Sequence, residues 1–222
     1  GESNRVVKDQ EQVDVRFAFC FPDVYEVGMS HLGMKILYGL FNEMDGVWCE
    51  RVFAPWPDME EQMREHQIPL YGLESGDAIT NFDFIGFTLQ YELSYSNVLN
   101  MLDLAGIPLY AKDRKGLGRI VVAGGPCACN CEPLADFLDL VFLGEGEEVD
   151  REVIELYRDC KKTGKTREEF LAAAAGIEGV YVPSLYQVDY HEDGTVKSIS
   201  PTQGAPARVK KRIVMDLDSL YY

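Results

Sequence analysis

Basic residues are scarce in this sequence. Its 222 residues include 21 Lys and Arg against 37 Asp and Glu, which gives a formal net charge of −16 at pH 7. Nucleic-acid-binding proteins place clustered Lys and Arg against the phosphates, and a strongly acidic chain does not favour such a surface. We interpret the one basic cluster, at 208–212, as a solvated strand edge. The composition therefore argues against a nucleic-acid partner.

Long hydrophobic runs are also missing. No apolar stretch approaches the roughly 20 residues that a membrane-spanning helix needs, and the polar start of the chain does not resemble a signal peptide. The six cysteines, three of them in one short stretch, do not form the pattern of a disulfide-rich secreted domain. We therefore expect a cytoplasmic protein without a membrane partner.

Several well-known site motifs are absent as well. The sequence has neither the G-x-x-x-x-G-K-[ST] loop of nucleoside triphosphatases nor the G-x-G-x-x-G loop of dinucleotide-binding proteins. Nucleotide phosphates are therefore not the leading ligand. With only three histidines, of which His66 and His191 lie in polar stretches typical of a surface, no Ser–His–Asp or Cys–His set can be identified.

What the sequence does contain is an alternation of strand and helix patterns. Short aromatic and β-branched runs predict buried strands, and apolar residues at three- and four-residue steps predict amphipathic helices. The expected strands are 15–21, 47–53, 82–89, 120–123 and 138–143, and the expected helices are 29–44, 58–66, 97–105, 133–137 and 147–163. This order predicts an α/β fold, doubly wound and flavodoxin-like, with a parallel five-stranded sheet.

The pattern changes after residue 164. A helix is expected at 167–175, then antiparallel strands at 180–182, 186–190 and 196–200, and one more strand at 208–215. We therefore divide the chain into a Rossmann-like domain, 1–164, and a small α+β extension, 165–222. The apolar last residues, DLDSLYY, suggest that a further domain follows.

Four strand-exit loops carry the candidate binding site. The carboxyl ends of parallel strands meet at one edge of a sheet, where ligands bind, and glycines there let the backbone approach a ligand closely. Four such loops at one edge predict a cleft. The candidate residues are Tyr25, Glu26, Val27, Gly28, Met29, Ser30 and His31, then Thr88, Leu89, Gln90 and Tyr91, then Gly124, Gly125 and Pro126, and finally Gly144, Glu145, Gly146 and Glu147.

Two kinds of polar residue in these loops have alternative interpretations. His31 could ligate a metal, or merely start the next helix behind Ser30 as its N-cap, and the second is favoured. Glu145, Glu147 and Glu148 could act as acid, base or hydroxyl acceptor, yet the helix dipole also favours acidic residues at a helix start.

The cysteines give a weaker signal. Cys127, Cys129 and Cys131 are spaced too closely for the usual zinc and iron–sulfur motifs, so no metal site is assigned to them and their role stays open. Cys20 and Cys49 lie in or beside predicted core elements, as does Cys160, and are expected to be buried.

Three segments carry a resemblance to a known family. FPDVYEVGMSHLGMKILY, GFTLQYELSYSNVLNMLDLAGIPLY and VVAGGPCACNCEPLADFLDLVFLGEGEE resemble the amino-terminal domain of cobalamin-binding-type radical SAM proteins, often named only as Fe–S oxidoreductases of unassigned substrate. The resemblance implies a Rossmann-like domain of the cobalamin-binding type that precedes a catalytic barrel. That barrel would hold a [4Fe–4S] cluster on a C-x-x-x-C-x-x-C motif and use S-adenosylmethionine. The motif is absent here, so the resemblance implies a non-catalytic fragment whose partner is its own radical SAM domain.

The sequence departs from the family pattern at one place. Cobalamin domains that supply a histidine ligand carry D-x-H-x-x-G, whereas here His31 follows Asp23 by eight residues. Two main hypotheses follow: the cleft binds a corrinoid, or the domain has lost that function and serves as a structural or substrate-gating domain. The second predicts a cleft filled by Tyr25, Met29, Gln90 and Tyr91, and an apolar patch at 217–222. A flavin-binding relative is a third, weaker idea, because only Ser30 would suit its phosphate loop. Substrate, reaction and oligomeric state stay open.

Overall fold

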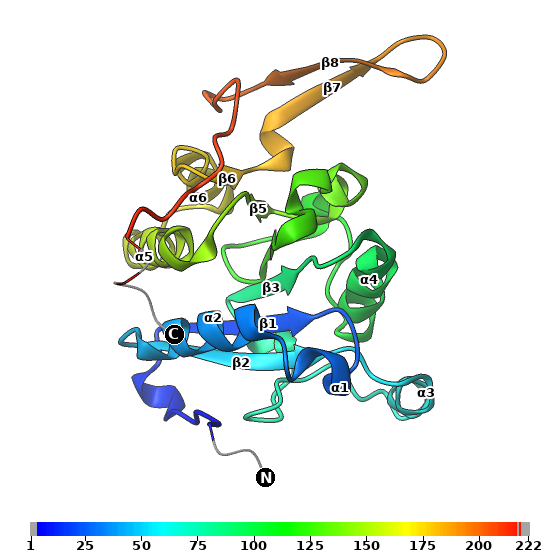
Figure 1. Cartoon of the computed structure of the whole chain (residues 1–222), viewed down its shortest axis with the longest axis vertical. Helices are drawn as coiled ribbons and strands as arrows, with labels where there is room; N and C mark the ends of the chain where they lie inside the picture. The colour runs from blue at the N-terminus through cyan, green and yellow to red at the C-terminus, as the bar shows by residue number, and fades with distance from the viewer. Residues whose placement is uncertain (1–3, 217, 219–222) are drawn as a thin grey trace.

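The computed structural model describes residues 4–216 and 218, and its centre is one mostly parallel sheet. The parallel strands are β1 (Val15–Phe21), β2 (Val47–Phe53), β3 (Phe84–Thr88), β4 (Ile120–Gly124) and β5 (Leu140–Phe142), and β6 (Val180–Tyr181) pairs antiparallel with β5. The strand order is β2-β1-β3-β4-β5-β6 (Figure 1). The first five strands therefore have the flavodoxin-like order, and the expected fold class is confirmed.

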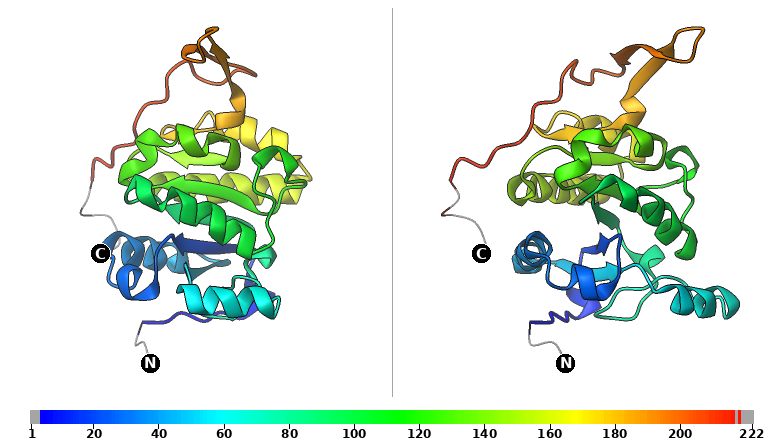
Figure 2. Two further views of the ribbon diagram at one scale, coloured as in Figure 1. Left: turned by 90° about the vertical axis from the view of Figure 1, so that its right-hand side faces the viewer. Right: turned by 45° about the vertical axis from the view of Figure 1, so that its right-hand side comes forward.

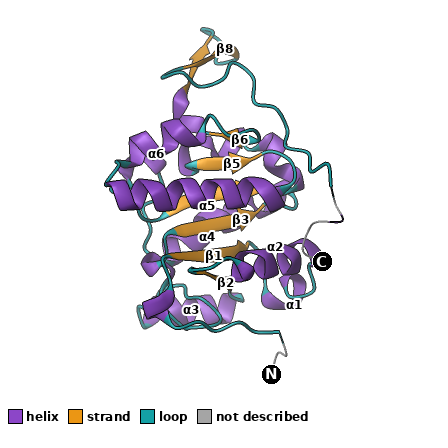
Figure 3. Ribbon diagram, turned by 90° about the vertical axis from the view of Figure 1, so that its left-hand side faces the viewer, coloured by secondary structure: helices purple, strands orange, loops and turns teal. Residues whose placement is uncertain are grey.

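Helices cover both faces of this sheet. On one face lie α2 (Leu32–Glu43), α5 (Gly146–Thr163) and α6 (Arg167–Ala174), which Figure 3 shows in front of the strands. The other face packs against α4 (Tyr95–Leu104) and α3 (Pro57–Glu65). Because both faces are covered, β1 is an almost continuous apolar run rather than an alternating one. No helix in the described part of the chain is long and apolar enough to cross a bilayer.

Three expectations for single elements need correction. The strand expected at 180–182 is antiparallel, as predicted, but it pairs with β5 at the edge of the main sheet, as β6, and not with the other strands of the extension. The strand expected at 208–215 is wrong: Arg212 forms only an isolated bridge with Gly144, where a φ of 113° turns the chain out of the sheet. The first helix starts at Leu32 rather than Met29, and a separate turn, α1 (Tyr25–Gly28), precedes it.

A hairpin projects from the end of the molecule beyond β6. It consists of β7 (Tyr186–Tyr190) and β8 (Val196–Pro201), which form a two-stranded antiparallel sheet of their own. Figures 1 and 2 show it standing away from the main sheet. Its turn contains Gly194 with a φ of 83°, a conformation that glycine adopts readily.

Candidate functional site

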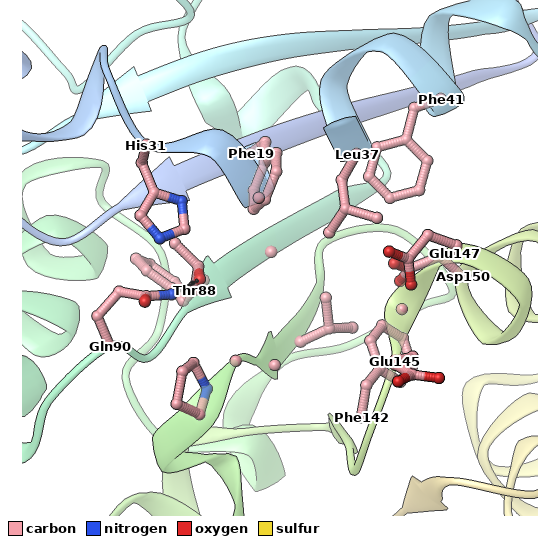
Figure 4. A pocket seen from close by; sticks show the side chains of 18 of the residues that line it. Phe19, His31, Leu37, Phe41, Thr88, Gln90, Phe142, Glu145, Glu147 and Asp150 are labelled. Carbon is pink, nitrogen blue, oxygen red and sulfur yellow. Dashed lines mark hydrogen bonds between the residues drawn. The ribbon is translucent and has the colours of Figure 1, made fainter. Parts of the chain in front are cut away.

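A cavity of about 340 Å³ lies between α2 and α5 on one face of the sheet. Its floor includes residues of β1, β3 and β4, and Figure 4 shows the side chains that line it. The neighbouring strands β1 and β3 are followed by helices on opposite faces, α2 and α4, so the winding of the sheet changes direction here. Ligands of open α/β sheets bind at this kind of switch point.

Ten of the eighteen sequence-predicted residues line this cavity. They come from all four strand-exit loops, which the fold brings to one edge. The ten are His31, Thr88, Gln90, Gly124, Gly125, Pro126, Gly144, Glu145, Gly146 and Glu147. The other eight, which lie outside the cavity, are Tyr25, Glu26, Val27, Gly28, Met29, Ser30, Leu89 and Tyr91.

Part of the first loop packs against the end of β2 instead of the cavity, while Val27, Met29 and Ser30 are exposed. A Cβ on Gly28 would lie 2.6 Å from the ring of Phe53, so only glycine allows α1 to sit this close to the sheet. The Tyr25 and Phe53 rings meet edge to face at 5.2 Å, and the Trp56 indole donates to Glu26 at 3.1 Å. The loop is thus held mainly by contacts within the fold.

His31 lies at the start of α2, as its sequence position predicted. Its Nδ1 accepts the Met34 N–H at 3.1 Å, which makes His31, and not Ser30, the N-cap of α2. The ring also lines the cavity (Figure 4). The Asp23 carboxylate instead accepts the Tyr91 hydroxyl at 2.7 Å and the backbone N–H of Val24.

The second and third loops are joined to each other. Gln90 Nε2 donates to the buried Thr88 hydroxyl at 2.5 Å, and the Leu89 N–H donates to the Gly124 carbonyl at 2.7 Å. Gly125 has a φ of 101°, and a Cβ there would lie 2.9 Å from the Leu89 carbonyl oxygen. These contacts place the Thr88 hydroxyl and the Gln90 amide on the wall of the cavity.

The fourth loop is held by a distant part of the chain. Arg212 pairs with Gly144 in the isolated bridge, and its guanidinium lies 2.7 Å from the Glu148 carboxylate. The carboxylate of Glu145 accepts the Val214 N–H. Glu145 is therefore partly engaged in the fold, whereas Glu147 faces the cavity without a described hydrogen bond.

Two residues that line the cavity were not predicted from the sequence. Gly86, in the middle of β3, lies under the cavity, and a Cβ there would come within 2.5 Å of the Phe17 ring. Asp150, on α5, is only 5% exposed, and burial together with the charge of Glu147 raises the pKa of its carboxyl well above the usual range. Both had a signal: a glycine inside a strand, and an acidic residue on the buried stripe that also carries Val153 and Ile154.

The three clustered cysteines do not form a metal site in the described part of the chain. No group of three or more His, Cys, Asp or Glu residues there could hold a metal ion. Cys127 is half-buried with its thiol 3.3 Å from the Gln90 carbonyl, Cys129 is exposed and Cys131 is buried. Cys20, Cys49 and Cys160 are buried, as expected.

Comparison with known proteins places this fold in a family. Residues 33–183 match the family model described as radical SAM proteins, N-terminal. An uncharacterized protein of Methanocaldococcus jannaschii is 30% identical over 135 residues, which make up 60% of this chain and 24% of that protein. The matched region thus spans about a quarter of that relative's length. No solved structure matches the chain significantly.

Proposed function

The chain belongs to the N-terminal domains of radical SAM proteins, and on this premise we propose that it is the accessory domain that binds a cobalamin-type cofactor. Its partner would be the radical SAM domain of the same protein, which would hold the [4Fe–4S] cluster and S-adenosylmethionine. The observation that carries the proposal is the cavity at the switch point of the sheet. Four exit loops supply its edge, which is the arrangement typical of cofactor sites in this fold class.

The cavity fits one part of such a cofactor. Its volume of about 340 Å³ suits a flat heterocycle at the end of a corrinoid tail but is too small for the macrocycle. Aromatic side chains of β1, α2 and β5 would pack against the heterocycle, and the macrocycle would lie on the rim near the exposed Gly125 and Pro126. When bound, such a cofactor supplies cobalt-based group-transfer or radical chemistry.

The protein's own polar groups would orient this ligand. The Thr88 hydroxyl and the Gln90 amide face the cavity and can exchange their mutual hydrogen bond for bonds to a ligand. His31 already accepts a backbone hydrogen bond through Nδ1 in its cap. The proposal therefore assigns no cobalt ligand to the protein, in keeping with the missing D-x-H-x-x-G motif.

Titration with hydroxocobalamin tests the proposal directly. We expect a change in the visible spectrum and retention of the corrinoid through desalting. Leu37→Trp, which places a large ring in the cavity wall, should weaken binding by at least about tenfold, the equivalent of about 1.4 kcal/mol. Ile36→Trp is the matched control, since Ile36 is half-buried on the same helix but does not line the cavity. No spectral change and no retention by the wild-type chain, either with hydroxocobalamin or with the cobamide that carries adenine, would contradict the proposal.

The alternative, a structural or gating domain, has one observation in its favour. Large apolar side chains are exposed around the strand-exit edge, among them Met29, Leu32 and Leu93, the last of them 88% exposed. A domain that docks on a barrel needs such a surface. However, of the bulky residues expected to fill the cleft, only Gln90 lines the cavity, and most of the expected patch at 217–222 lies outside the described residues. Two results together would support this alternative. The chain would not bind hydroxocobalamin, and it would co-purify with the separately expressed radical SAM domain, whereas the Leu93→Asp variant would not.

A further inference from the structure

One carboxyl group inside the cavity has no role in holding the fold. Four acidic side chains are buried among the described residues, and three of them are paired. Glu50 meets Arg16 at 2.5 Å and Glu74 meets Arg51 at 2.7 Å, while Asp139 lies between two arginines. Asp150 is the fourth, and it makes no hydrogen bond or ion pair with any residue that the structure describes. A buried polar group without a partner destabilises the fold, so a ligand is the natural partner for this one.

The position of Asp150 makes its carboxyl accessible from the cavity. A Cβ on Gly146 would lie 2.7 Å from Asp150 Oδ2 and 3.5 Å from the methyl carbons of Leu37, so the carboxyl lies at the first turn of α5, beside α2. Gly146 has no side chain to cover it. Figure 4 shows the Asp150 and Glu147 carboxyls pointing from α5 toward the space near Leu37 and Phe41.

Much of the cavity wall is apolar and aromatic, although Glu147 also lines it. Phe17 and Phe19 come from β1, Phe41 comes from α2, and Phe142 comes from β5. Such walls favour a flat ring that can pack against aromatic faces and edges. The wall therefore favours a flat ligand group, and the buried Asp150 carboxyl favours one that can hydrogen-bond to it.

We propose that Asp150 is the specificity-determining residue of the cavity, and that it selects a flat heteroaromatic group that presents an amino N–H, of the aminopurine class. The assignment of this group to the corrinoid tail rests on the proposed function. The selection of the heterocycle by the cavity does not depend on it. Asp150 would accept the amino N–H, and the aromatic wall would pack against the ring.

The chemistry of a carboxyl explains the selection. A carboxyl accepts an N–H in either protonation state, and when it keeps its proton it also donates to a ring nitrogen beside the amino group. The raised pKa of Asp150 favours this protonated form. A ring of the same shape without the amino group would leave the carboxyl buried and without its donor, and sites built in this way reject such analogues strongly.

The test uses two bases that differ only in the amino group. Binding of 9-methyladenine and 9-methylpurine to the 222-residue chain is measured by NMR titration, and we expect a preference for 9-methyladenine of roughly 10- to 100-fold. Asp150→Leu should abolish the preference. Asp150→Asn should retain it, because an amide can also pair with the amino edge of adenine. Asp159→Asn, at an exposed position on the same helix, is the control and should behave as wild type.

Other outcomes overturn the inference, and they are separable from a failure of the proposed function. Equal affinity for the two bases, binding of neither, or a preference that survives in Asp150→Leu would each contradict it. The comparison of 9-methyladenine with 9-methylpurine uses the wild-type chain, so it does not depend on whether a variant folds. A parallel titration with cobamides that carry adenine or dimethylbenzimidazole separates the two ideas. Retention of both cobamides, independent of Asp150, would leave the corrinoid proposal standing and refute the inference. A preference for 9-methyladenine without retention of either cobamide would support the inference and refute the corrinoid proposal.

Discussion

At the scale of single residues, Asp150 links ligand binding to stability. Burial and the nearby Glu147 raise the pKa of its carboxyl, so the folded state keeps a proton that the unfolded state releases. A raised pKa means that stability is fully present below the unfolded value of about 3.9 and is lost as pH rises toward the folded value. Each carboxyl of this kind therefore destabilises the fold at neutral pH.

Asp150→Asn should consequently stabilise the chain, and more so at higher pH. We expect the Tm to rise by about 2–4 °C per kcal/mol removed, with a gain that grows from about pH 5 to about pH 8. Calorimetry across this range measures the effect, with Asp159→Asn as the exposed control on the same helix. If the gain in Tm were largest at acid pH, the pH dependence would have the wrong sign, and a raised pKa for Asp150 would be refuted.

A second buried aspartate is expected to behave in the opposite way. Asp139 lies 2.5 Å from Arg167 and 3.1 Å from Arg114, and it accepts the Val121 N–H at 2.8 Å. Asp139→Ala would leave two buried guanidinium groups without their counter-charge, so we expect a loss of about 3–5 kcal/mol in the free energy of unfolding.

Urea denaturation measures this loss. The control is Asp103→Ala, which removes an exposed ion pair with Arg64 and should cost no more than about 1 kcal/mol. Similar losses in the two variants would show that the buried cluster contributes no more than a surface pair.

At the scale of elements, the cap of α2 joins the cavity to the helix that forms its wall. His31 accepts the Met34 N–H and so begins α2 directly at the edge of the cavity. His31→Ala should lower the free energy of unfolding by about 1 kcal/mol, whereas His31→Asn should largely restore it, because Asn is a good N-cap residue. Equal destabilisation by both substitutions would mean that ring packing, including the 5.4 Å contact with Phe21, matters more than the cap.

At the scale of the whole molecule, the hairpin of β7 and β8 is expected to be dispensable for the core. It forms its own sheet, and the Thr202 N–H donates to the Leu185 carbonyl at its base at 2.7 Å. Replacing residues 187–200 by a two-residue turn should change the Tm by less than about 2 °C, since an isolated two-stranded hairpin is only marginally stable. A large drop in Tm would show that the hairpin contributes to the stability of the main sheet.

Local patterns were enough for most of the fold. The bounds of β1 and β2 match the expected ranges, and α5 begins one residue earlier than expected. These elements could be predicted because the periodicity of apolar residues depends only on the geometry of a strand or helix. The prediction of a strand at 208–215 was wrong because β propensity does not supply a pairing partner. This segment forms only a single bridge with the sheet, at Gly144.

The sequence by itself determined the order of the elements, the doubly wound topology and the edge at which the exit loops meet, because each follows from short-range periodicity and turn chemistry. Tertiary structure alone decided which of those loops face a common space. It packed Tyr25 and Gly28 of the first loop against Phe53, placed Gly86 on the lining of the cavity and left Asp150 unpaired within it. The physical reason is that burial and pairing of a side chain depend on residues that are distant in sequence, and their positions are fixed only when α2 and α5 pack on the same face of the sheet.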